Sequence, residues 1–131
     1  DYIADPRYKL ELYRRFAGLD YGEKDDLLDE IIDRFGEPPE EVEVLWRVAC
    51  LRALCRLLHI RGISVKPGEL RITFAENAAI DPTALMQLIS EQQQYMNFKS
   101  GVQAQLIFRT VKLKTDSLTW LEKNLPRLAF D

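Results

Sequence analysis

The sequence predicts an α+β fold: three N-terminal helices, then a ββαββα order, with helices packed on a small antiparallel or mixed sheet. Apolar residues recur at intervals of three and four as far as about residue 59, whereas polar and apolar residues alternate after Gly62. At 131 residues, 47% of them hydrophobic, the chain is long enough to bury a core. We therefore expect a single domain over 1–131, with a helical part over about 1–61 and a sheet-containing part over about 62–131.

The first helix is expected over about 6–19 and the second over about 23–35. Asp5 can cap the first helix, and Pro6 suits its first helical position. Each segment carries an apolar stripe at helical spacing, formed by Tyr8, Leu12 and Phe16 in the first and by Leu27, Leu28, Ile31, Ile32 and Phe35 in the second. Gly36 follows, and glycine commonly ends a helix in a left-handed conformation.

A third helix is expected over about 39–59, because Pro38 and Pro39 stop the second helix and suit the start of another. Apolar residues lie on most of its sides, which predicts a central helix. Trp46 in this helix and Trp120 near the C-terminus have leucine neighbours, so we expect them to anchor cores rather than to form ligand platforms.

Two hairpins and two helices are expected after Gly62. "ISV" and "LRITFA" predict strands joined at Pro67-Gly68, and "YMNF" and "VQAQLIFRTV" predict strands joined around Ser100-Gly101. Between the hairpins, Asp81 and Pro82 start a helix in the same way as Asp5 and Pro6. "DSLTWLEKNLPRLAF" predicts a closing helix that Pro126 bends or ends.

Motifs for catalysis and cofactor binding are missing from the sequence. It contains no GxxxxGK[ST], GxSxG, HExxH or EF-hand loop. His59, the only histidine, is expected to stabilise a helix C-terminus rather than to act as a general base. Cys50 and Cys55 point in different directions on one helix, so we expect two inert thiols in a reducing cytosol. We therefore expect a cytoplasmic, non-catalytic chain without a metal or cofactor site.

The chain begins without a methionine, a signal-peptide pattern or an apolar run long enough to span a membrane. We expect it to be part of a longer protein. Its net charge of −3 is unevenly distributed, since residues 1–60 carry 14 acidic and 9 basic residues and residues 61–131 carry 7 and 9. The acidic half would repel phosphates, which argues against nucleic-acid binding by that half.

Acidic residues gather on one side of the second helix, opposite its apolar stripe. At 100° per residue, Asp26, Glu30, Asp33 and Glu37 fall together, with Arg34 on their flank. Like charges at i,i+4 repel, so this face mildly destabilises an isolated helix. Two interpretations stay open: a solubilising surface, or a docking face for an arginine-rich protein partner.

Basic residues near the end of the second hairpin allow a further interpretation. Arg109 and the "KLK" of 112–114 could contact a phosphate backbone, although basic residues at a strand end also protect sheet edges. Direct contact with nucleic acid is therefore the alternative function.

Three segments resemble the C-terminal domain of the bacterial transcription-repair coupling factors, the Mfd family of DNA translocases. They are "YIADPRYKLELYRRFAG", "LLDEIIDRFGEPPEEVEVLWRVACLRALCRLLHIRGI" and "LTWLEKNLPRL". The run "IDRFG" with its following proline and acids, continuing through "RLLHIRGI", is the most specific part. The region 63–110 is similar only loosely.

The resemblance implies a parent protein that binds stalled RNA polymerase, moves on DNA with a motor that uses ATP and Mg²⁺, and recruits excision repair through UvrA. It also implies that the C-terminal domain is regulatory and non-catalytic: it packs against a UvrB-like N-terminal module, hides the UvrA-binding surface and restrains the motor. In the family, an E-x-x-D-R-F-G helix faces arginines of that module, which corresponds to Glu30, Asp33 and Arg34 here. Glu37 and Pro38 depart from the family pattern.

Overall fold

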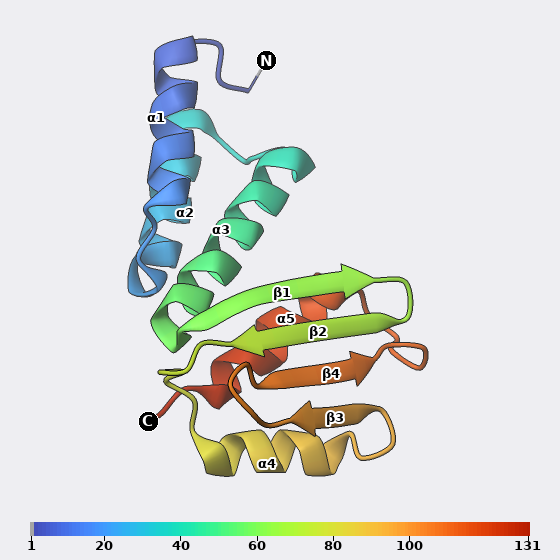
Figure 1. Cartoon of the computed structure of the whole chain (residues 1–131). Helices are drawn as coiled ribbons and strands as arrows, with labels where there is room; N and C mark the ends of the chain where they lie inside the picture. The colour runs from blue at the N-terminus through green and yellow to red at the C-terminus, as the bar shows by residue number, and fades with distance from the viewer. Residues whose placement is uncertain (1) are drawn as a thin grey trace. The chain divides into compact units, whose positions relative to one another are not determined.

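The computed structural model describes residues 2–131, which form an α+β fold in the predicted order (Figure 1). The elements are α1 (Pro6–Ala17), η1 (Tyr21–Glu23), α2 (Lys24–Phe35), α3 (Glu40–Leu58), β1 (Ile60–Lys66), β2 (Glu69–Phe74), α4 (Pro82–Glu91), β3 (Met96–Lys99), β4 (Gln105–Arg109), α5 (Ser117–Asn124) and η2 (Leu125–Leu128). None of the described helices is long and apolar enough to cross a membrane. The predicted fold class is confirmed.

The chain consists of two compact units, one ending at Leu54 and the other running from Cys55 to Asp131. The first unit contains α1, η1, α2 and most of α3. The second contains the last turn of α3, all four strands and the remaining helices.

The first unit is a set of helices around its own apolar core. Asp5 caps α1 by accepting a hydrogen bond from the Arg7 backbone N–H at 2.9 Å, and Pro6 occupies the first turn as predicted. The buried residues of this core are Ile3, Leu12, Phe16, Leu19, Leu27, Ile31, Ala49, Cys50 and Ala53. Trp46 packs against this core and donates its indole N–H to the Lys24 carbonyl at 2.9 Å, which fixes α3 against the start of α2.

The end of α2 depends on Gly36. Its φ of 84° confirms the predicted positive-φ stop, but its ψ of −174° is extended rather than left-handed helical. The Gly36 N–H still donates to the Ile32 carbonyl at 2.8 Å, while its own carbonyl accepts the Tyr2 hydroxyl at 2.5 Å. A side chain is strongly disfavoured in this region of φ and ψ, so glycine is needed for the turn into α3.

The second unit contains a four-stranded sheet in the order β1-β2-β4-β3 with antiparallel pairing throughout, which excludes the mixed alternative. The predicted strand "ISV" is the centre of a longer strand, because the chain turns at His59 and β1 begins at Ile60. His59 has a φ of 56°, an uncommon conformation for a residue other than glycine. Helix α3 therefore ends at Leu58, before the predicted change of pattern at Gly62.

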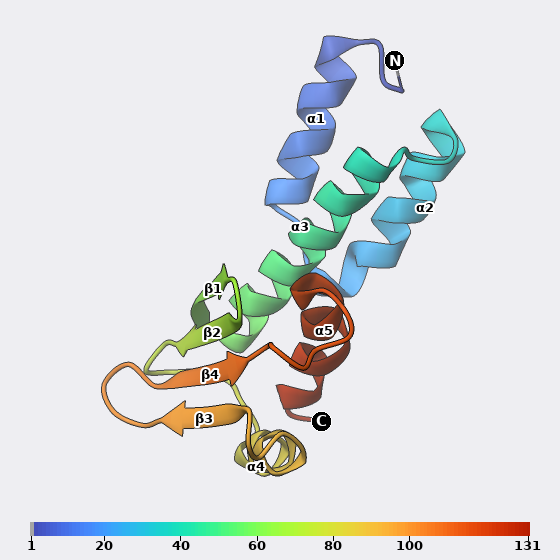
Figure 2. The ribbon, with the colours of Figure 1, turned by 90° about the vertical axis from the view of Figure 1, so that its right-hand side faces the viewer.

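Helix α5 covers one face of the sheet (Figure 2), and the buried residues on this face are apolar. Leu70, Ile72 and Phe74 alternate with polar neighbours along β2, as predicted, and all three are buried. The Phe108 ring of β4 lies against the Trp120 ring of α5, with centroids 4.7 Å apart. Trp120 is thus a core anchor, as expected from the sequence.

Helix α4 begins, and helix α5 ends, at the expected signals. Asp81 accepts a hydrogen bond from the Thr83 backbone N–H at 3.0 Å. Asp116 accepts a hydrogen bond from the Thr119 backbone N–H at 2.7 Å. Helix α5 ends at Asn124, and Pro126 lies in the tighter turn η2, as expected for proline.

Candidate functional site

The acidic side of α2 is the feature that the sequence singles out, and the structure places its residues in different surroundings. Asp26 and Asp33 are exposed, and neither makes an ion pair within residues 2–131. Glu30 lies between them and is half-buried. All three belong to α2, so the predicted geometry holds for these acids.

Glu30 is neutralised from within the unit. Its carboxylate forms an ion pair and a hydrogen bond with the Arg15 guanidinium of α1. This bond holds the pKa of Glu30 below its ordinary value, and the charges of Arg15 and Arg34 act in the same direction. The charge of Glu30 is therefore compensated by Arg15, which approaches it from another helix.

Arg34 is held by aromatic rings. Its guanidinium lies 5.2 Å from the ring centroid of Tyr8 in α1 and 5.2 Å from that of Phe35. Such cation–π contacts restrict a long side chain that would otherwise be mobile in solvent. Arg34 nevertheless stays exposed, so its polar edge is accessible to a partner.

Glu37 does not share the helical face, which corrects the sequence-based geometry. Helix α2 ends at Phe35, and the extended backbone at Gly36 redirects the chain before Glu37. Its carboxylate lies near Tyr2: burial raises the pKa of the Tyr2 hydroxyl, and the charge of Glu37 raises it further. The 100° rotation per residue cannot be extended across a non-helical glycine.

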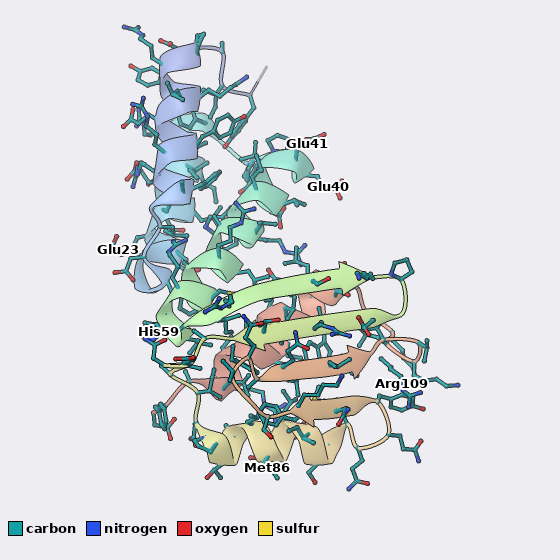
Figure 3. All side chains as sticks on the ribbon, viewed as in Figure 1. Glu23, Glu40, Glu41, His59, Met86 and Arg109 are labelled. Atoms are coloured by element: carbon teal, nitrogen blue, oxygen red, sulfur yellow. The ribbon has the colours of Figure 1, made fainter. Side chains whose placement is uncertain are left out.

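A groove of about 470 Å³ lies between α1 and α2. It is lined by Glu11, Arg14, Arg15, Gly18, Leu19, Asp20, Glu23, Asp26, Leu27 and Glu30. The structure thus brings Asp26 and Glu30 together with acids from α1 and the connecting turn, where Figure 3 shows Glu23. Asp33 and Arg34 do not line this groove.

The additional groove acids were missed by the sequence analysis. Glu11 lies in α1, Asp20 in the turn after it and Glu23 in η1, so no single helical periodicity relates them. Their only sequence signal is the general acidic excess of the first half. The groove also contains Arg14 and Arg15, which makes its charge mixed rather than uniformly negative.

The remaining residues that the sequence singled out are His59 and the two cysteines. His59 is exposed, and its Nδ1 lies 2.9 Å from the Asn77 carbonyl oxygen. Neither Cys50 nor Cys55 forms a disulfide bond in the part of the chain that the structure describes, and burial raises the pKa of the Cys55 thiol to about 11. Within residues 2–131, no three His, Cys, Asp or Glu side chains are grouped to hold a metal ion.

Relatives of this chain are transcription-repair coupling factors. The protein of that name from Bacillus subtilis is 38% identical over 90 residues, which cover 66% of this chain and 8% of the relative. The Escherichia coli protein is 28% identical over 129 residues, covering 98% of this chain and 11% of the relative. The chain therefore corresponds to about a tenth of the length of the relatives that it matches.

A solved structure has the same fold. The crystal structure of the C-terminal domain of transcription-repair coupling factor aligns with a TM-score of 0.73 and 23% sequence identity, covering 97% of this chain and 84% of that one. A family model described as the TRCF domain matches residues 1–85, which include the whole first unit and the first hairpin. On this match the chain belongs to the TRCF domain family.

Proposed function

We propose that this chain is a non-catalytic regulatory domain that docks, through α2, on an arginine-rich surface of a UvrB-like module in its parent protein. The docked domain covers the surface that UvrA binds and restrains an ATP-driven DNA translocase. The parent is a transcription-repair coupling factor that acts at stalled RNA polymerase.

The observation that carries the proposal is the arrangement of Glu30, Asp33 and Arg34. Asp33 is exposed without an ion-pair partner in residues 2–131, while Arg15 and the Tyr8 ring orient Glu30 and Arg34. Orientation before binding lowers the entropic cost of ordering long side chains at an interface. A partner guanidinium can bind the Asp33 carboxylate in a bidentate way, and a partner carboxylate can bind Arg34.

The length of the relatives supports an intramolecular partner. This chain corresponds to 8–11% of two transcription-repair coupling factors, so most of such a protein lies outside it. A tether raises the effective concentration of the docking surface, which makes a modest electrostatic contact sufficient. Such a contact can also be released when another ligand competes for the partner surface.

The test is a charge change on α2 in the intact parent protein. Glu30→Gln combined with Asp33→Lys should expose the covered surface, and we expect tighter UvrA binding and a faster ATPase rate. Glutamine at position 30 avoids placing a lysine against Arg15. The matched control is Glu40→Lys with Glu41→Gln at the start of α3, where both acids are exposed (Figure 3).

The control makes the same change in net charge away from α2. If the α2 variant leaves UvrA affinity and ATPase rate unchanged, the proposed docking face is wrong. If both variants raise them equally, the effect comes from net charge and not from this surface.

A further inference from the structure

The sheet has a second face that no element of the Cys55–Asp131 unit covers (Figure 2). Side chains alternate along strands, so this face carries the residues between the buried ones. We call it the open sheet face; it comprises Ser64, Lys66, Glu69, Arg71, Thr73, Asn97, Lys99, Gln105, Ile107 and Arg109. It is predominantly polar, in contrast to the face under α5.

The charges of the open sheet face are mostly positive. Lys66, Arg71, Lys99 and Arg109 contribute one cation from each strand, against the single acid Glu69 among its ten residues. Lys66 pairs across β1–β2 with Glu69, which in turn faces Arg109 across β2–β4. Arg71 is opposite Ser64 and Ile107, and Lys99 is opposite Gln105, so the four cations are distributed over the face with other residues between them.

Two of these cations are held in place. Arg71 donates to Gln105 Oε1 at 3.2 Å and to Glu69 Oε1 at 3.3 Å. The guanidinium of Arg109, which Figure 3 labels, lies 5.8 Å from the centroid of the Tyr95 ring and donates a hydrogen bond to the Gln94 carbonyl. The arginines therefore stand in fixed positions, while Lys66 and Lys99 are exposed at the edge strands.

Apart from Glu69, which lies on the open sheet face, three acids of this unit are engaged at its helices. Asp81 and Asp116 cap α4 and α5, and Glu91 of α4 forms an ion pair with Arg127 at 2.6 Å. The unit has 10 basic and 7 acidic residues, so its net charge alone is small. What distinguishes the sheet is that positive charge collects on one face.

We propose that the open sheet face binds the phosphate backbone of duplex DNA. Lysines and arginines distributed over one face of a sheet can contact several phosphates, and such contacts carry no information about base sequence. Single strands bind to sheets largely by base stacking on aromatic rings, and here the Tyr95 ring is already covered by Arg109. The proposal stands apart from the docking of α2, because it uses different residues in the other unit.

The number of cations sets the expected salt dependence. Four phosphate contacts correspond to a slope of about −3.6 for log K against log salt, or a loss of roughly 100-fold between about 50 and 200 mM. Glu69 opposes this binding, so its removal should strengthen it. A slope near zero is expected for contacts that are not made to phosphates.

The test measures binding of a fluorescent random-sequence duplex to the 131-residue chain by anisotropy at several salt concentrations. Lys66→Gln with Lys99→Gln should weaken binding at low salt and reduce the slope by about 2, since each lost phosphate contact removes about 1. The control is Arg52→Gln with Lys123→Gln, two exposed cations on α3 and α5, which should leave the slope unchanged.

A gain-of-function variant keeps the test decisive even if the double variant unfolds. The glutamine of Glu69→Gln can still accept a hydrogen bond from Arg71, but it no longer repels phosphates. The variant should therefore bind the duplex several-fold more tightly at low salt. The proposal is overturned by no duplex binding at low salt, by an equal loss in the control, or by no gain in Glu69→Gln. Tighter binding of a single strand or of polyglutamate than of the duplex would also overturn it, because the face would then select another partner.

Discussion

Arg15 of α1 and Glu30 of α2 form an ion pair across the groove between the two helices. Both side chains are about two-fifths exposed, at 41% and 43%, so the pair lies at the surface and not in the core. Its main effect is to fix the direction of Glu30 within the proposed docking face. Its contribution to stability is expected to be small.

The stability contribution of this pair should depend on pH. Arg15 lowers the pKa of folded Glu30 from 4.5, so the contribution is present above 4.5 and is lost as the pH falls through the folded pKa. We expect Arg15→Gln to lower the free energy of unfolding at pH 7 by less than about 1 kcal/mol. Urea titrations at pH 7 and well below 4.5 should show this difference shrinking, whereas Arg14→Gln should have little effect at either pH.

Arg34 and Tyr8 should be energetically coupled, because the guanidinium lies over the ring. In a double-mutant cycle with Arg34→Gln and Tyr8→Leu, we expect a coupling of about 0.5–1 kcal/mol. Urea denaturation of the four proteins provides the measurement. Additive effects of the two substitutions would show that the contact does not restrain Arg34, which would weaken the proposed role of Tyr8 in orienting it.

Gly36→Ala should destabilise the chain by about 1–3 kcal/mol, because φ of 84° with ψ of −174° is nearly restricted to glycine. Within residues 2–131, no heavy atom other than those of Gly36 and its two chain neighbours lies within 4 Å of a Cβ added there, so the cost comes from the backbone alone. Gly62→Ala is the matched control, because a Cβ added at Gly62 also has open space around it whereas the φ of Gly62 is not positive. Thermal denaturation should show a loss for Gly36→Ala only; equal effects would contradict the backbone explanation.

The Cys55 thiol should react slowly at neutral pH, because burial raises its pKa to about 11 and the thiolate is the nucleophile. Alkylation by iodoacetamide, followed by peptide mass spectrometry, should show a rate that still rises above pH 9. In the urea-unfolded chain the rate should level off near the ordinary thiol pKa of 9.0. A plateau near 9 in the folded chain would mean that the thiol is more exposed than the structure shows.

Local signals in the sequence predicted most of the fold. The pairs Asp5-Pro6 and Asp81-Pro82 start helices because a carboxylate cap and a proline with fixed φ act within a few residues. The alternation of Leu70, Ile72 and Phe74 with polar residues is also a local signal, and it predicted the buried face of β2. The turn at His59 was missed, since a positive φ at a histidine has no residue-type signal comparable to glycine.

The candidate site was predictable only as far as one helix extends. Asp26, Glu30 and Asp33 follow from helical rotation, but Glu37 was misplaced because that rotation stops at Gly36. Arg15 reaches Glu30 from another helix, a tertiary contact that no local spacing encodes.

The open sheet face was inaccessible to sequence analysis for a related reason. Its cations are far apart in the chain and meet only through the order β1-β2-β4-β3. Strand order depends on which edges pair during folding, and alternation within each strand does not specify it.

The two tryptophans are divided between the compact units. Trp46 is half-buried and hydrogen-bonded to the Lys24 carbonyl, while Trp120 is buried against Phe108. Each unit therefore carries its own intrinsic fluorophore, in a distinct environment. With Trp46→Phe and Trp120→Phe variants, the melting of the helical unit and that of the sheet unit become separately visible, and coincident curves would identify one cooperative folding transition.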